Sequence, residues 1–295
     1  MGSNVPSSLT PPNPAAPALA HAFVTAPNHV PTRWILFLHG VFGSGNNFRT
    51  LARRWVASEP SLGLVLVDLR MHGRSQGFPP PHNLEAAARD LLAIDALVAA
   101  RGGAVRGVVG HSLGGKVALE YVAAKRGRLG RAWIIDSNPG ARPNAAGSES
   151  TLRVYELLRS LPPLFPTRAA FNDALAAGGL DSAMIQWLAM NVDAVDGGYR
   201  FRLDLDAIDA LLRDYFVRDL WPIVENPPGD VAVELIIGGR SLVLDSADRE
   251  RAAQAARENP ERVAVHIIPE ASHWVHVDAP DALFALLSSH PPPTP

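Results

Sequence analysis

Short hydrophobic runs alternate with longer amphipathic stretches through the first half of the chain. The stretches at 46–58 and 83–103 repeat apolar residues at helical spacing, and glycines close the second. The runs are short and continuously apolar, as in strands that are buried on both faces. Such alternation predicts an α/β fold, in which a mostly parallel central sheet has helices on both faces. Four runs are predicted as its strands: 33–40, 62–70, 105–112 and 131–140.

The alternation stops after residue 140 and resumes near residue 229. The intervening residues form four helix-like stretches separated by Pro or Gly, with one short strand-like piece, YRFRL. Two more apolar runs, 231–239 and 262–274, and a helix at 278–289 follow. This arrangement predicts a helical cap inserted after the sixth strand of the fold. The predicted units are a disordered proline-rich extension at 1–20, a core at 21–140 and 229–295, and a cap at 141–228.

The composition narrows the classes of function. With a formal net charge of -2 and no basic stripe, the chain is not expected to bind nucleic acid. It has no cysteine, which excludes disulfides, thiolate zinc sites and cysteine nucleophiles. No apolar run is long enough to cross a membrane, and the N-terminal segment lacks the features of a secretory signal. We expect a cytoplasmic protein, monomeric or homodimeric, with a small-molecule partner.

One serine lies between two glycines at a predicted strand-to-helix turn. Residues 108–121 read VVGHSLGGKVALEY, with an apolar strand before the serine and helical periodicity after it. Such a turn is sharp enough that Gly110 and Gly114 are needed to avoid steric collision, while the hydroxyl projects above the sheet. The pattern predicts that Ser112 is the nucleophile of an acyl-transfer reaction.

A serine nucleophile requires a general base, and position selects among the ten histidines. His273, in EASHWVH, follows the last predicted strand, from where its loop returns toward Ser112. We favour it over His276 in the same loop, which is otherwise expected to help fix the final helix. Five others are set aside by position: His21, His29 and His290 lie near the ends, His266 lies inside a strand, and His111 is expected to pack.

The developing oxyanion requires preorganised donors. The backbone amides of Leu113, at a helix N-terminus, and Val41, after the first predicted strand, are expected to form this oxyanion hole. His39 is expected to support the Val41 loop. Asp68, Arg70 and His72, in DLRMHGRS, are expected to order that turn as an internal ion pair rather than to form a second site.

Four motifs in this order resemble the α/β-hydrolase superfamily: HGVFGSGNNF, DLRMHGRS, GHSLGGKVALEY and SHWVHVDAP. More narrowly, residues 33–288 look like the esterases grouped with abhydrolase domain-containing protein eleven and its bacterial relatives. HGVFGS followed by NNF, the lysine after GHSLGG, IIGGRS and SHWVH carry this narrower similarity. The cap resembles that group only loosely.

The resemblance leaves three carboxylates open as the acid of the triad. Many members of the superfamily carry the acid four residues into a Gly-x-x-Asp turn, but here Ser241 stands in that place. Asp136 ends a strand, where some members place their acid; Asp206 matches a position sometimes assigned in the subgroup. Asp245 is in the expected loop, but an N-cap explains it more simply. We favour Asp136, because a strand end is rigid, with Ser241 as an accessory hydrogen-bonding partner.

Together these residues predict a serine hydrolase that cleaves carboxylic esters or thioesters of short to medium acyl chains through an acyl-enzyme. The alternatives are carbon–carbon bond hydrolysis or cofactor-free perhydrolysis on the same triad, or a non-catalytic role in ligand binding or partner stabilisation. Neither a metal nor a cofactor is implied. The acyl pocket between core and cap is expected to be lined by Phe42, Leu113, Met184, Trp187, Met190 and Phe216.

Overall fold

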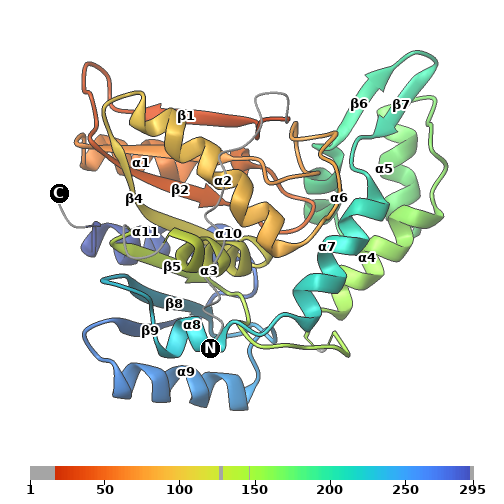
Figure 1. Cartoon of the computed structure of the whole chain (residues 1–295). Helices are drawn as coiled ribbons and strands as arrows, with labels where there is room; N and C mark the ends of the chain where they lie inside the picture. The colour runs from red at the N-terminus through yellow and green to blue at the C-terminus, as the bar shows by residue number, and fades with distance from the viewer. Residues whose placement is uncertain (1–16, 126–128, 146, 293–295) are drawn as a thin grey trace, which may run out of the picture.

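The computed structural model describes residues 17–125, 129–145 and 147–292. Within them, seven strands form one sheet in the order β1-β3-β2-β4-β5-β8-β9 (Figure 1). All neighbours are parallel except β1, which pairs antiparallel with β3 at the edge. The predicted α/β fold is therefore confirmed. The strands are β1 His21–Thr25, β2 Arg33–Leu38, β3 Leu62–Val67, β4 Ala104–His111, β5 Arg131–Ile135, β8 Ala232–Gly238 and β9 Val263–Ile268.

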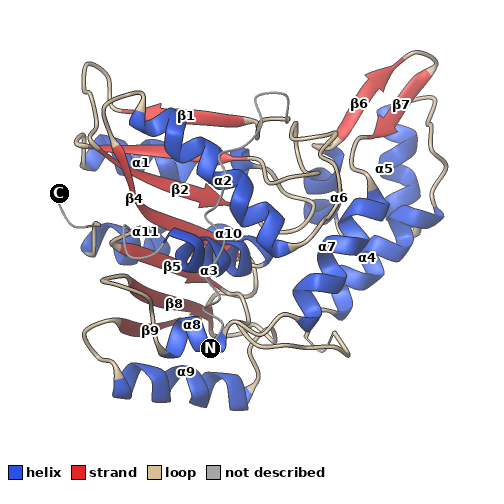
Figure 2. Cartoon of the chain, viewed as in Figure 1, coloured by secondary structure: helices blue, strands red, loops and turns tan. Residues whose placement is uncertain are grey.

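Helices cover both faces of the sheet (Figure 2). Alternate residues of a strand point to opposite faces, so Leu36 and Leu38 join one apolar cluster while Ile35 and Phe37 join another. The first cluster includes side chains of α2 (Leu84–Ala99), α3 (Leu113–Lys125), α8 (Trp221–Glu225) and α9 (Ser246–Glu258). The second includes α1 (Arg49–Ser58) and α11 (Pro280–Ser289), with the short η1 (Gly45–Phe48) and α10 (Val275–Asp278).

The cap is a separate layer to one side of the sheet (Figure 1). It contains a small hairpin, β6 Val192–Val195 with β7 Gly198–Phe201, so the strand-like YRFRL pairs with a strand that the sequence did not indicate. Among the described residues the cap follows the fifth strand, not the sixth, because a single edge strand, β1, precedes the parallel strands. Its helices are α4 Glu149–Ser160, α5 Arg168–Ala177, α6 Ser182–Ala189 and α7 Leu205–Val217.

Two predicted boundaries differ from the structure. By position α8 falls within the predicted cap, but its buried residues Trp221 and Val224 belong to a helix that contacts α3 and α9 of the core. At the other end, residues 17–20 belong to the core. Leu19 is buried, and the Ala20 amide donates to Ser75 Oγ at 2.8 Å. The remaining part of the predicted extension, 1–16, lies outside the described residues.

The carboxyl ends of the parallel strands meet at the edge of the sheet that faces the cap (Figure 1). In open parallel sheets, ligands bind beyond this edge. The segments that follow β2, β4, β5, β8 and β9 therefore set the geometry of the candidate site. None of the described helices combines the length and hydrophobicity needed to span a membrane.

Candidate active site

Ser112 lies at the sharp turn between β4 and α3. Its φ is 53°, in the left-handed region, and its amide donates to the Ile135 carbonyl of β5 at 3.0 Å. A Cβ at Gly110 would lie 2.2 Å from the Gly114 carbonyl oxygen, and one at Gly114 would lie 2.5 Å from the Leu38 oxygen. Backbone approaches this close explain why both positions are glycine. The turn thus has the strained geometry of a nucleophile elbow.

A continuous chain of hydrogen bonds joins Ser112 to a buried carboxylate. His273 Nε2 is 3.1 Å from Ser112 Oγ, and His273 Nδ1 is 2.7 Å from Asp136 Oδ2. An aspartate that accepts at Nδ1 assigns the proton to that nitrogen, so Nε2 is left as an acceptor for the hydroxyl. These three side chains follow β4, β9 and β5, from distant parts of the sequence. The arrangement has the geometry that a general base needs toward a serine nucleophile.

Asp136 is fully buried at the end of β5. Besides His273, it accepts hydrogen bonds from Ser241 Oγ at 2.5 Å and from the Gly238 amide at 3.0 Å. These donors replace the water that burial removes from the carboxylate. Ser241, which stands where the superfamily often has an acid, thus contacts Asp136.

The structure places the two alternative acids away from His273. The Asp206 side chain is 86% exposed in the first turn of α7 and pairs with Arg159 of α4. A carboxylate in the first turn of a helix is stabilised by the helix dipole and by solvent, which accounts for this placement. Asp245 is the N-cap of α9 and accepts from the Asp248 amide, as its sequence context predicted.

Val41 and Leu113 both line the same cavity as Ser112. Within the described residues, no carbonyl or side chain accepts a hydrogen bond from the backbone amide of either residue. His39 supports this region as expected: its Nδ1 donates to the Gly40 carbonyl at 2.7 Å, and its Nε2 accepts from the Leu69 amide at 3.0 Å. Burial lowers the pKa of His39 to about 4, so the ring stays neutral in this role.

Sequence reasoning missed Asn191, which connects the cap to the same loop. Its side chain is buried and donates to the Phe42 carbonyl at 2.7 Å. Phe42 has a φ of 62°, a strained conformation that this contact helps to fix. No local pattern marks Asn191, because its partner lies 149 residues away along the chain.

A layer of buried histidines lies beneath His273. The His111 ring does more than pack: its Nε2 donates to the His273 carbonyl at 2.8 Å. His276 lies behind it, with its ring 4.9 Å from that of His111 and 5.0 Å from that of Phe48. Burial lowers the pKa of His276 to about 4 and holds that of His111 well below its usual value. His111 therefore fixes the position of the loop that carries His273.

The DLRMHGRS turn is structural, but its partners differ from the predicted internal ion pair. Asp68 accepts hydrogen bonds from the amides of Gly45 and Arg74, at 2.8 and 2.9 Å. Arg70 pairs with Asp90 of α2 at 2.7 Å. The sequence could not show this, because Asp90 belongs to a helix twenty residues further along the chain.

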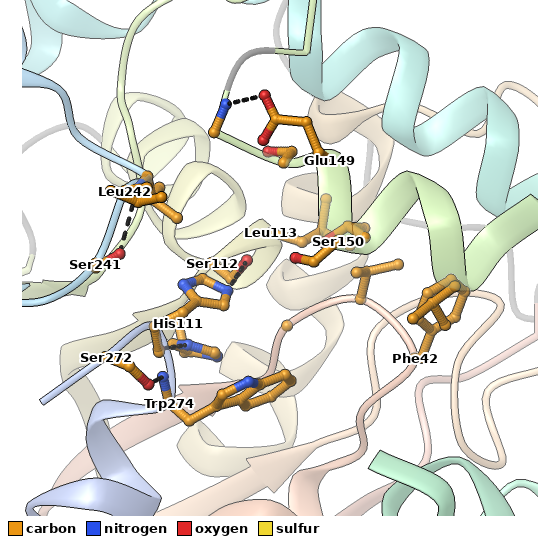
Figure 3. Close-up of a pocket in the computed structure, with 18 of the residues that line it drawn as sticks. Phe42, His111, Ser112, Leu113, Glu149, Ser150, Ser241, Leu242, Ser272 and Trp274 are labelled. Atoms are coloured by element: carbon orange, nitrogen blue, oxygen red, sulfur yellow. Dashed lines mark hydrogen bonds between the residues drawn. The ribbon is translucent and has the colours of Figure 1, made fainter. Parts of the chain in front are cut away.

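A cavity of about 340 Å³ lies between sheet and cap. Figure 3 shows Ser112, His111 and Trp274 at its base, with Glu149 and Ser150 of α4 across from them. The predicted pocket residue Met190 lies outside it: Met190 follows the end of α6 and is 50% exposed. Burial raises the pKa of Tyr215 to about 12, so its phenol stays neutral. The apolar lining comprises Val41, Phe42, Leu113, Val154, Met184, Trp187, Leu212, Phe216, Leu242, Val243 and Trp274.

Among the described residues, the one group of side chains close enough to hold a metal lies apart from this cavity. It consists of Glu234, His266 and His290, none of which lines the cavity. The cavity itself offers a hydroxyl, an imidazole and free amides, which suit acyl transfer.

Comparison with known sequences decides the family. Residues 35–286, which make up most of the chain, match the alpha/beta hydrolase family. The chain belongs to the alpha/beta hydrolase family. The resemblance drawn from its motifs is thereby confirmed.

Similar alpha/beta hydrolases include proteins named as a lipase and an esterase. The sn-1-specific diacylglycerol lipase ABHD11 of Danio rerio is 28% identical over 258 residues, covering 83% of this chain and 74% of the relative. Esterase YbfF of Escherichia coli is 28% identical over 269 residues, covering 88% of this chain and 93% of the relative. A solved marine microorganism esterase shares the fold, with a TM-score of 0.73 at 23% identity over 91% of this chain and 97% of that one.

Proposed function

We propose that this alpha/beta hydrolase is a serine esterase of small-molecule carboxylic esters or thioesters. Ser112 Oγ attacks the acyl carbonyl carbon, and His273 Nε2 takes the hydroxyl proton. The amides of Val41 and Leu113 stabilise the oxyanion of the tetrahedral intermediate. Asp136 holds the proton of His273 on Nδ1 and balances the imidazolium that forms.

The two half-reactions then follow from the same groups. Collapse of the intermediate breaks the ester bond, and His273 returns its proton to the leaving alkoxide or thiolate, which departs as the alcohol or thiol. Water enters, gives a proton to His273 and attacks the acyl carbon. The second intermediate releases the carboxylic acid, and the proton returns to Ser112 Oγ.

The observation that carries this proposal is the unbroken hydrogen-bond chain from Ser112 Oγ through His273 to Asp136 Oδ2, with distances of 3.1 and 2.7 Å. The relatives named as a diacylglycerol lipase and as an esterase support ester hydrolysis. The cavity supports an expectation about the length of the acyl chain. Its lining is mainly apolar, and its volume of about 340 Å³ is near the lower limit for ligand pockets. We therefore expect short to medium acyl chains.

The test is hydrolysis of p-nitrophenyl esters from acetate to palmitate, with one acyl-CoA thioester, by the wild type and Ser112→Ala. Ser288→Ala, which removes a hydroxyl on α11 that contacts only its own helix, is the matched control. We expect turnover in the wild type and the control and none above background in Ser112→Ala. A fluorophosphonate probe should label the wild type and Ser288→Ala but not Ser112→Ala.

Labelling of Ser112 without turnover of any ester would contradict the proposal. The remaining hypotheses would then be carbon–carbon bond hydrolysis, perhydrolysis or ligand binding without catalysis. Turnover that persists in Ser112→Ala would remove the serine mechanism altogether.

A further inference from the structure

Three side chains meet on one face of the sheet, away from the catalytic edge. Glu234 lies in the first half of β8, and His266 lies in β9. The register pairs Glu234 with Ala264 and Ile236 with His266, so both side chains are on the same face as diagonal neighbours. α11 covers this face, and His290 follows its last residue. As candidates for the general base, His266 was set aside as a strand residue and His290 as a residue near the chain end.

Two distances within this group are close to those between metal ligands. Glu234 Oε2 is 3.2 Å from His266 Nε2 and 3.6 Å from His290 Nδ1. The ligand atoms of the three side chains all lie within 4.8 Å of one another. Around a tetrahedral zinc ion with bonds of about 2.1 Å, neighbouring ligands are about 3.4 Å apart. We propose that Glu234, His266 and His290 bind a divalent transition metal of the zinc type.

The carboxylate is already oriented for this role. The Glu234 side chain is only 2% exposed, and Arg131 pairs with its other oxygen, Oε1. That contact turns Oε2 toward the two imidazoles. The positive charge of the Arg131 guanidinium beside Glu234 weakens the attraction of this carboxylate for a cation.

The two histidines differ in exposure in a way that suits an open site. The His266 side chain is 20% exposed and that of His290 is 48% exposed, so water can complete the coordination. The segment after His290 is held in place, because Arg33 Nη1 donates to the Pro292 carbonyl at 2.8 Å. Two imidazoles with one carboxylate favour zinc, nickel or copper over magnesium or calcium. The chain has no cysteine to compete for such ions.

A bound ion would join the end of α11 to β8 and β9. The three ligands are brought together only in the folded chain, so binding stabilises the native state over the unfolded one. Because α11 follows closely after His273, the ion would secure a segment adjoining the catalytic loop without entering the cavity. The site is thus expected to act on stability and not on the chemistry of Ser112.

The test is titration of the full chain, free of any histidine tag, with ZnCl₂ by isothermal calorimetry. We expect one ion per chain and a rise in Tm of a few degrees when free zinc is about tenfold above its Kd. His290→Ala and His266→Leu should each weaken binding at least tenfold and remove the rise in Tm. His29→Ala, an exposed histidine whose ring contacts only the Pro27 carbonyl, is the matched control and should bind as the wild type does.

Equal zinc affinity in His290→Ala and His29→Ala would overturn the proposal, as would less than about a fifth of an equivalent bound by the wild type at 100 µM. Because His290 is half-exposed and in no strand or helix, His290→Ala should fold normally. It therefore keeps the test decisive if His266→Leu does not fold. The cobalt form gives a second readout, since loss of an imidazole ligand changes its visible absorption.

Discussion

The sheet and the cap position their side chains by different means. In the sheet, Asp136 and Ser112 adjoin strand ends, and each is fixed by backbone hydrogen bonds from a neighbouring strand or turn. The cap is joined to the sheet by apolar packing and by a few polar contacts, such as Asn191 to the Phe42 carbonyl. Catalysis requires placement within about 0.5 Å, whereas an apolar wall tolerates more. Substitutions in the sheet should therefore affect turnover, and substitutions in the cap should affect substrate binding.

The largest effect is expected for Asp136→Asn. An amide there removes the charge that balances the imidazolium and favours the wrong tautomer of His273, so kcat should fall about 10³–10⁴-fold. Asp206→Asn makes the same change at the exposed carboxylate of the cap and should leave kcat within about twofold. The measurement is kcat on p-nitrophenyl butyrate, with circular dichroism to show that both variants fold.

The reverse result would contradict the assignment of the acid. Near-normal kcat in Asp136→Asn, together with a large loss in Asp206→Asn, would mean that the cap supplies the carboxylate. The contrast between sheet and cap would then fail at its most important point.

Acid should affect the sheet region more than the cap. Burial lowers the pKa of His39 and His276 to about 4 and that of His72 to about 3, whereas residues 141–228 contain no histidine. Below pH 6.5 the unfolded chain binds protons that these folded rings do not. The stability that the neutral rings contribute is therefore complete above pH 6.5 and is lost as the pH falls toward 4. Each ring should lower the free energy of unfolding by up to about 1.4 kcal/mol per pH unit.

Urea unfolding between pH 7.5 and 5 measures this slope. His276→Leu removes one of the titrating rings, and its Nδ1 has no hydrogen-bond partner among the described residues, so an apolar replacement is suitable. The variant should show a shallower dependence on pH. An unchanged slope would mean that His276 does not contribute to acid sensitivity.

Lys116 tests how the cap is held. This buried lysine on α3 donates to the carbonyls of Gly140, Tyr215 and Arg218 at 2.8, 2.7 and 2.7 Å, which lie where the chain enters and leaves the cap. Lys116→Met would leave these carbonyls without their donor, at a cost of about 2–4 kcal/mol of stability. We expect KM to rise about tenfold while kcat changes less than about threefold.

Lys125→Met is the matched control, because Lys125 is on the same helix and pairs with Asp95 of α2. It should leave KM unchanged. If Lys116→Met instead lowered kcat with KM constant, the lysine would position the turn that precedes α3. It would then not be needed to hold the cap.

The sequence revealed the sheet and its catalytic edge because each feature has a local cause. The glycines around Ser112 are required by backbone approaches, and Asp136 and His273 follow apolar runs that are recognisable as strands. The cap was less predictable. The sequence predicted both Met184 and Met190 as pocket residues, but α6 ends at Ala189 and Met190 lies outside the cavity.

Contacts between distant segments could not be predicted from the sequence either. The partner of Arg70 lies on α2, and Asn191 donates to the Phe42 carbonyl in the loop after β2. Neither contact follows from periodicity or spacing, because both depend on how helices pack against the sheet edge. The cluster of Glu234, His266 and His290 has the same origin, since only the strand register and the position of α11 bring it together.

The smallest effect is expected at the cap wall, with Trp187→Ala. The Trp187 ring lies 4.7 Å from that of Trp274, next to His273, and 6.3 Å from that of Phe42 in the loop after β2. Its removal should leave acetate hydrolysis within about twofold. For longer esters, loss of contact with two methylenes corresponds to about 1.5 kcal/mol, or about a tenfold fall in kcat/KM.

Met190→Ala is the control on the same cap segment, outside the cavity, and should not change the chain-length profile. The ratio of kcat/KM for hexanoate to that for acetate is the measurement, because it cancels any change in the amount of active enzyme. Equal losses for acetate and hexanoate in Trp187→Ala would mean that the indole fixes Phe42 or Trp274 rather than contacting the acyl chain. In that case the cap would help to position the catalytic edge, and its separation in role from the sheet would be incomplete.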